Sequence, residues 1–195
     1  MAWVGFVNGK LLPIHWFEGS VNGNQYLEIL KNKVWPSARG TATRDGLWFM
    51  QDGAKPHTTN DCLEFLQEKL QNRVVSNRLE FFWPAKSPDL NPLDFFFWGV
   101  AEKSVYDAKP RSLEQLKKVV ELCAKNVTRE TLIKAAQNFR KRATLCLANE
   151  GATSNTFLNS RLISFLNKTF HNMLIINVIK RTYISFFHHM GENHD

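Results

Sequence analysis

The apolar run at residues 47–50 (LWFM) restricts the fold more than any other feature, because an acid and a helix follow it closely. Four consecutive apolar residues between polar loops are typical of a buried strand. Asp52 comes at the carboxyl end of this strand, and residues 60–70 carry apolar side chains along one helical face. A strand that leads through a turn into an amphipathic helix is the repeating unit of α/β proteins. We therefore expect an α/β fold.

The segment before this unit predicts a hairpin and a helix. Asn8-Gly9 lies between two apolar segments, and these residues accept the positive φ angles of a type I′ turn. A β-hairpin is therefore expected over residues 2–17. Residues 25–34 have helical apolar spacing, and a polar loop is expected over residues 36–46.

The segment after this unit is expected to become mainly helical. Residues 79–82 (LEFF) predict another strand, and a helix is expected to begin near Leu93 after a proline-rich turn. Ser112 with Gln115 at the capping-box position predicts a helix start, and Thr128 predicts a second one.

The composition shifts after about Gly151. Residues 151–195 hold four of the six histidines, without metal-ligand spacing, and their apolar residues show no clean helical or strand period. The stretch at residues 173–187 is too short and too charged for a membrane span. We expect a main domain over residues 1–150 and an unpatterned, poorly ordered tail over residues 151–195.

Composition and charge narrow the class of protein. The chain has 15 Phe, 6 Trp and 3 Tyr, so disorder over its whole length is not expected. Its net charge of +7 favours a polyanionic partner such as nucleic acid or a membrane surface. The three cysteines form no CxxC pair, which argues against a zinc site and fits reduced thiols in an intracellular protein. The N-terminus lacks the features of a secretory signal.

Two acids are candidates for metal ligands. Asp52 follows the apolar strand, and Asp94 follows a proline-rich turn. Ligand-binding groups gather where strands end in α/β sheets, and two adjacent carboxylates require a cation between them. Mg²⁺ or Mn²⁺ prefers such oxygen ligands. On the residues alone the alternative stays open, since acids beside Gly or Pro, such as Asp89, commonly form turns or caps.

The sequence blocks around these acids resemble a known family. QDGAKPHTT, at residues 51–59, and WPAKSPDLNPLDFFFWG, at residues 83–99, resemble the second and third catalytic blocks of mariner-superfamily DDE/D transposases. The resemblance extends outward on both sides and covers roughly residues 1–150. It implies an RNase H-like mixed sheet flanked by helices. It also implies metal-dependent cleavage and transfer of DNA strands at transposon ends.

Residue by residue, the resemblance makes Asp52 the second acid and Asp94 the third acid of the metal-binding set. Asp94 rather than Asp89 matches, because the catalytic residue is the last one of the S-P-D-L-x-P-x-D/E pattern. The implied cofactor is Mg²⁺ or Mn²⁺, with DNA as the partner, a homodimer as one assembly and the nucleus as the location. The gap between the acids is longer than in the best-known members, and residues 71–78 are expected to lengthen a loop there.

The sequence also departs from the family pattern. The first acid of the family lies on a strand upstream of the hairpin, and this chain starts at the hairpin; Asp45 sits in the wrong loop to replace it. We therefore expect a truncated catalytic domain that binds metal weakly and does not cleave DNA efficiently. A non-catalytic, transposon-derived protein that binds nucleic acid or dimerises is the alternative.

Several polar residues near the acids are candidates for contacts with DNA. Lys55 and His57 belong to the second block, and Lys86 and Ser87 precede the third. The basic cluster at residues 140–142 is a further candidate for phosphate contacts. For each, a solvated surface side chain is the common alternative. The aromatic run at residues 95–98 is expected to pack in the core more than to stack on bases.

Overall fold

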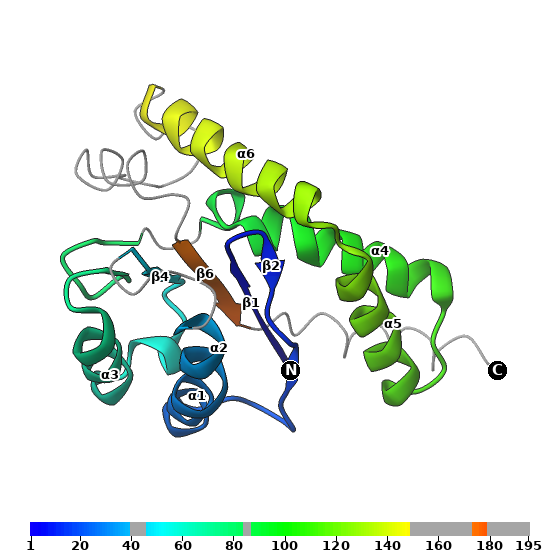
Figure 1. The fold of residues 1–195 in the computed structure, drawn as a ribbon. Helices are drawn as coiled ribbons and strands as arrows, with labels where there is room; N and C mark the ends of the chain where they lie inside the picture. The colour runs from blue at the N-terminus through cyan, green and yellow to red at the C-terminus, as the bar shows by residue number, and fades with distance from the viewer. Residues whose placement is uncertain (40–45, 84–86, 149–172, 179–195) are drawn as a thin grey trace.

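The computed structural model describes residues 1–39, 46–83, 87–148 and 173–178. These residues build a sheet with helices on both of its faces (Figure 1). The strand order is β2-β1-β6-β4-β5, and β3 also pairs with β1. The mixture of helices and strands agrees with the expected α/β character, and the RNase H-like assignment stays a prediction.

The N-terminal hairpin is confirmed. β1 (Ala2–Val7) pairs antiparallel with β2 (Lys10–Leu11) and with β3 (His15–Trp16). Asn8 and Gly9 at the turn have φ angles of 49° and 73°. Both lie in the left-handed region that the type I′ turn requires.

The helix expected over residues 25–34 is longer than the sequence suggested. α1 (Gly23–Ile29) continues through a π-helical segment, η1 (Leu30–Val34), into α2 (Trp35–Arg39). The loop expected from Pro36 onward is therefore wrong over its first residues. Pro36 is the second residue of α2, and α2 follows the π-helical segment directly. Single π-helical segments of this kind occur inside α-helices.

The central α/β unit is confirmed, but the strand after it was placed wrongly. β4 (Trp48–Gln51) leads to α3 (Asn60–Leu70), as expected. The next strand is β5 (Val74–Val75), which pairs parallel with β4 within residues 71–78, where the sequence predicts a loop. Of residues 79–82, Phe81 alone bridges to the sheet. The two valines of β5 are buried at 2% and 0% exposure. Buried β-branched side chains favour a strand, which explains why this segment pairs with β4.

β6 (Met173–Val178) comes from the C-terminal tail and lies between β1 and β4. It runs antiparallel to β1 and parallel to β4, and Ile176 is level with Gln51 of β4. In this strand order β6 joins the hairpin to the β4–β5 pair. These six residues are thus central to the sheet rather than an appendage to it. The division at residue 150 stays a prediction, and the rest of the tail lies outside the described residues.

The later helices begin where the sequence placed them. The Ser112 hydroxyl caps α5 (Leu113–Asn126) by accepting from the Gln115 N–H at 3.2 Å. Thr128 caps α6 (Arg129–Ala148) through the Thr131 N–H, also at 3.2 Å. The third block forms a 3₁₀ turn, η3 (Pro88–Leu90), then a π-helical segment, η4 (Leu93–Trp98), and then α4 (Gly99–Ala108).

Alternation along the strands divides the core between the two faces of the sheet. Val4 and Met50 pack in the cluster under α4, α5 and α6, whereas Trp3 and Phe49 pack in the cluster under α1 and α3. Within the described residues no helix is both long and apolar enough to cross a membrane.

Candidate functional site

Asp52 lies directly after β4, at the carboxyl end of its parallel pairing with β5 and β6. The buried strand holds the backbone in place up to Gln51. The Oδ1 atom of Asp52 accepts a hydrogen bond from the Ala54 N–H at 3.0 Å, which closes a tight turn after the strand. The Asp52 side chain is 30% exposed, so the carboxylate is anchored on one oxygen and accessible to solvent.

His57 packs against the Asp52 carboxylate. It lies in a short 3₁₀ segment, η2 (Lys55–Thr58), and its Nδ1 atom is 2.6 Å from Asp52 Oδ1. The His57 side chain is fully buried, and its ring lies 4.3 Å from the Tyr26 ring at an interplanar angle of 32°. The His57 ring therefore acts as a packed wall that fixes the position of the carboxylate.

Gln51 ties this arrangement to three other segments. Its Oε1 atom accepts a hydrogen bond from the Tyr26 hydroxyl at 2.9 Å. Its Nε2 atom donates to the His57 carbonyl at 2.9 Å and to the Ser76 hydroxyl at 3.3 Å. Gln51, His57, Tyr26 and Ser76 all have 0% exposure. The buried hydrogen bonds of Gln51 hold the adjacent Asp52 in one geometry.

Tyr26 stays a hydrogen-bond donor in this network. Burial, and secondarily the negative charge of Asp52, raises the pKa of Tyr26 well above its ordinary value. The neutral phenol is therefore the form present near neutral pH. Sequence reasoning missed both Tyr26 and Gln51 as supports of the site. The one signal was Gln51 beside Asp52 in the matched block.

An open cavity of about 600 Å³ lies in front of Asp52. Met1, Asn22, Lys55 and Thr59 are among the residues that line it. Lys55 is exposed and places a positive charge near the carboxylate. An anionic group that enters this cavity would meet an amine as well as an acid.

Asp94 lies in the π-helical segment η4, where it is half-buried. Its N–H donates to the Asn91 carbonyl at 2.9 Å, and the Asn91 side chain accepts from the Leu93 N–H at 3.0 Å. Phe97 and Trp98 of the same segment are buried at 0% and 1% exposure. These anchors pack η4 against β1 and β6, the strand next to β4.

Asp52 follows β4, and Asp94 lies on η4; both of these elements contact β6. Among the described residues no group of three or more His, Cys, Asp or Glu side chains forms a metal site. The partners of Asp52 in the described structure are Ala54 and His57. A cation shared by the two aspartates stays a prediction.

Arg142 of α6 holds the third block in place, and sequence reasoning missed this role. Its Nη1 atom donates to the Asp89 carbonyl at 3.2 Å, and its guanidinium lies 4.3 Å from the Phe95 ring centroid. This cation–π contact and hydrogen bond connect α6 to the segment on either side of Asn91. The sequence alone predicts only that Arg142 belongs to a basic cluster.

The other expected DNA-contacting residues differ in accessibility. Lys55 is exposed, as a phosphate contact requires. His57 is buried, so the expectation of a direct contact with DNA is corrected: it acts on Asp52 instead. Ser87 is also buried, at 4% exposure. Lys86 lies outside the described residues. Of the aromatic run, Phe97 and Trp98 are in the core, as expected.

Comparison with known proteins finds transposases among the relatives of this chain. The chain is homologous to transposases of transposable elements. It is 30% identical to the Tc3 transposase of Caenorhabditis elegans over 106 residues, which are 54% of this chain and 30% of that protein. It is 30% and 27% identical to the Tcb1 and Tcb2 transposases of Caenorhabditis briggsae over 115 residues, which are 59% of this chain and 39% of each relative. The matched part thus spans about a third of each relative. No protein-family model matches the chain.

Proposed function

We propose that residues 1–150 are part of a DDE/D transposase catalytic domain, with Asp52 as its second acid and Asp94 as its third. In this proposal DNA is the substrate, and the parent reaction is metal-dependent strand cleavage and transfer. The observation that carries the proposal is the anchored carboxylate of Asp52 at the end of β4. The homology to transposases supports the same conclusion.

The donor set suits a hard divalent cation. Asp52 and Asp94 offer carboxylate oxygens, the ligands that Mg²⁺ and Mn²⁺ prefer. One oxygen of Asp52 is engaged by the Ala54 N–H, and its 30% exposed side chain leaves room for a cation at the other oxygen. A bound cation would stabilise the charge that develops on a phosphate during strand cleavage. His57 and Gln51 hold Asp52 in position for that role.

Two carboxylates supply fewer ligands than the three that the family resemblance implies. We therefore expect weak metal binding by the polypeptide of residues 1–195. The alternative function is a non-catalytic DNA-binding or dimerising protein derived from a transposon. The net charge of +7 favours the DNA-binding form of this alternative.

A plasmid-nicking assay tests the activity of this polypeptide. Purified residues 1–195, incubated with supercoiled plasmid and Mn²⁺, are expected to produce no nicked product above the background of a D52N/D94N variant. The reason is that two carboxylates cannot hold the metal ions firmly enough for cleavage. Metal-dependent nicking that D94N abolishes would contradict the expected inactivity and support Asp94 as a metal ligand. Nicking that both variants retain would point to a contaminating nuclease and require a repeat with further purified protein.

A further inference from the structure

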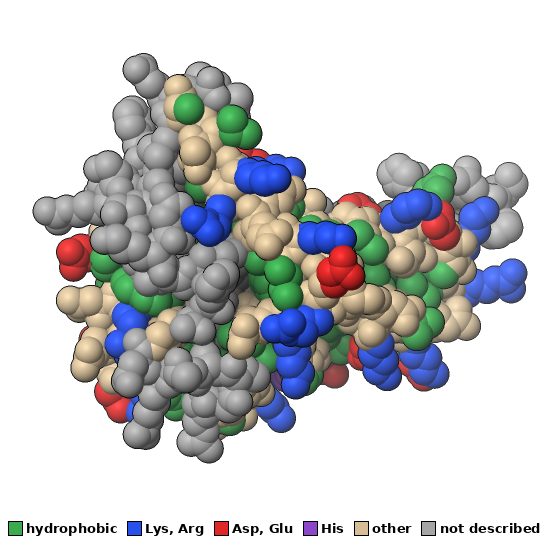
Figure 2. Space-filling view, turned by 45° about the horizontal axis from the view of Figure 1, so that its top comes forward, with side chains coloured by type: hydrophobic (Ala, Val, Ile, Leu, Met, Phe, Trp, Pro, Cys, Tyr) green, Lys and Arg blue, Asp and Glu red, His purple; other side chains and the backbone are tan. Residues whose placement is uncertain are grey.

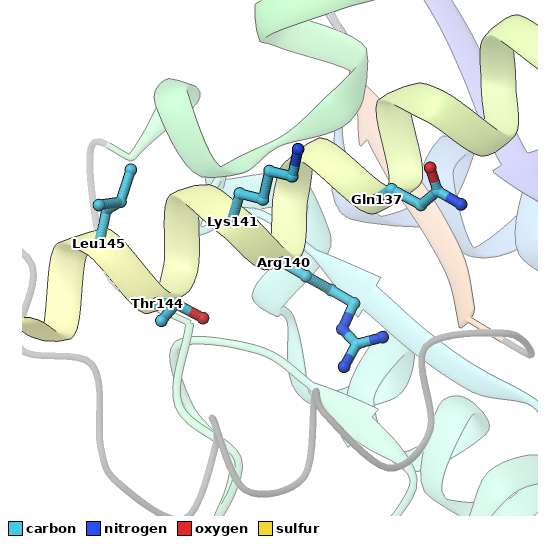
Figure 3. A pocket seen from close by; sticks show the side chains of 5 residues that line it. All are labelled: Gln137, Arg140, Lys141, Thr144 and Leu145. Atoms are coloured by element: carbon cyan, nitrogen blue, oxygen red, sulfur yellow. The ribbon is translucent and has the colours of Figure 1, made fainter.

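One face of α6 forms an open, basic groove. Gln137, Arg140, Lys141, Thr144 and Leu145 line a cavity of about 650 Å³, and they project from successive turns of the helix (Figure 3). Their spacing of three, one, three and one residues puts them on one side of α6. From Gln137 to Leu145, this face extends roughly 12 Å at about 1.5 Å per residue.

No described acid neutralises the charge on this face. Within α6 the acid Glu130 pairs with Lys134 at 2.8 Å, at the opposite end of the helix from the groove. Arg140 and Lys141 are exposed, and neither forms an ion pair with any described residue. Lys and Arg side chains recur over the face of the molecule shown in Figure 2. Two unpaired cations one residue apart attract a polyanion.

The side chains on this face have the chemistry of a phosphate site. Arg and Lys only donate hydrogen bonds, and an Arg guanidinium can donate two to one phosphate. Gln137 and Thr144 add neutral donors of the kind that commonly contact the DNA backbone. Leu145 is the one apolar residue among the five and is 61% exposed. A single apolar side chain offers too little apolar surface for a membrane-binding face.

The groove is fixed to the segment that carries Asp94. Phe139 and Ala143, at 0% and 3% exposure, bury the opposite side of α6 in the core. Arg142, between the two sides, bonds to the Asp89 carbonyl and covers the Phe95 ring. A polyanion held on α6 therefore lies on an element bound directly to the third block.

We propose that this face of α6 binds the phosphate backbone of DNA, with Arg140 and Lys141 as the main contacts. The proposal rests on DNA as the partner in the proposed function. It requires neither metal nor cleavage, so binding measured in EDTA separates it from the role of the two aspartates.

The test measures the salt dependence of binding to a fluorescent DNA duplex by anisotropy. The R140Q/K141Q variant is expected to bind at least tenfold more weakly at low salt. The negative slope of log K against log salt concentration is expected to become shallower by about 1.8, since each lost phosphate contact removes about 0.9 from its magnitude. The matched control, K103Q/K118Q, removes the same charge from α4 and α5, where these exposed lysines pair with Asp107 and Glu114.

The control separates a local contact from a general charge effect. It is expected to leave the slope within half a unit of that of the unaltered chain. Equal losses in the two variants would overturn the proposal, because net charge alone would then explain binding. An unchanged slope in R140Q/K141Q would also overturn it, as would binding of the unaltered chain to phosphatidylserine vesicles but not to DNA. Circular dichroism of each variant verifies that the helices are intact.

Discussion

The Ile175→Pro variant is expected to abolish the cooperative folding of this chain. Ile175 lies in the middle of β6, level with Phe6 of β1 on one side and with Met50 of β4 on the other. Proline has no N–H and does not fit a strand that is paired on both sides, so the substitution removes a ladder hydrogen bond and breaks the pairing of β6. Since β6 joins the two halves of the sheet, the loss affects both of them.

Thermal unfolding followed by circular dichroism measures this effect. We expect the unaltered chain to unfold in one transition and the I175P variant to show none, or one lowered by more than about 10 °C. The matched control is Ile175→Val, which keeps both the backbone N–H and the β-branched side chain and is expected to cost about 1 kcal/mol. A stable I175P variant would show that the sheet does not need β6.

The second large effect is expected from Gln51→Leu. Leucine has a similar size, but it leaves the Tyr26 hydroxyl, the His57 carbonyl and the Ser76 hydroxyl without the bonds that Gln51 makes. Each unsatisfied buried group costs about 1–3 kcal/mol, so for these three groups we expect a total of at least about 3 kcal/mol. Urea unfolding measures it. The control is Gln67→Leu at an exposed position of α3, where a change within about 0.5 kcal/mol is expected.

A double-mutant cycle locates the origin of this loss. Tyr26→Phe removes the hydroxyl that Gln51→Leu leaves unsatisfied. The double variant is therefore expected to be more stable than the sum of the two single losses predicts, by about 1 kcal/mol. Additive losses would indicate that the Tyr26–Gln51 bond contributes nothing to stability, and the network could not then be what holds Asp52.

Local signals in the sequence predicted most of the helices and the hairpin. Asn8-Gly9 specifies its turn through backbone sterics, and Ser112 and Thr128 specify helix starts through side chains that reach only three residues ahead. The two strand errors have a different origin. β5 and β6 are strands because of what they pair with, and those partners are distant in sequence. Short apolar segments carry no periodic signal that reveals such partners.

In the candidate site too, the features set by local sequence were predicted and those set by distant contacts were not. The position of Asp52 after a buried strand followed from residues 47–52 alone. The hydrogen-bonded residues that hold Asp52 come from α1, β4, η2 and the residue after β5. No local sequence pattern connects Tyr26 or Ser76 to Asp52. Arg142 is a similar case, because its contacts with Asp89 and Phe95 depend on how α6 crosses the third block.

If Asp52 and Asp94 form one metal site, a crystal of the chain grown with Mn²⁺ will hold an ion between their carboxylates. The anomalous difference map locates the ion without reference to any assumed ligand. We expect one Mn²⁺ peak about 2.0–2.3 Å from an oxygen of each carboxylate, and no such peak in a D94N crystal. Carboxylates on opposite faces of the sheet, or a Mn²⁺ ion bound by neither aspartate, would contradict it.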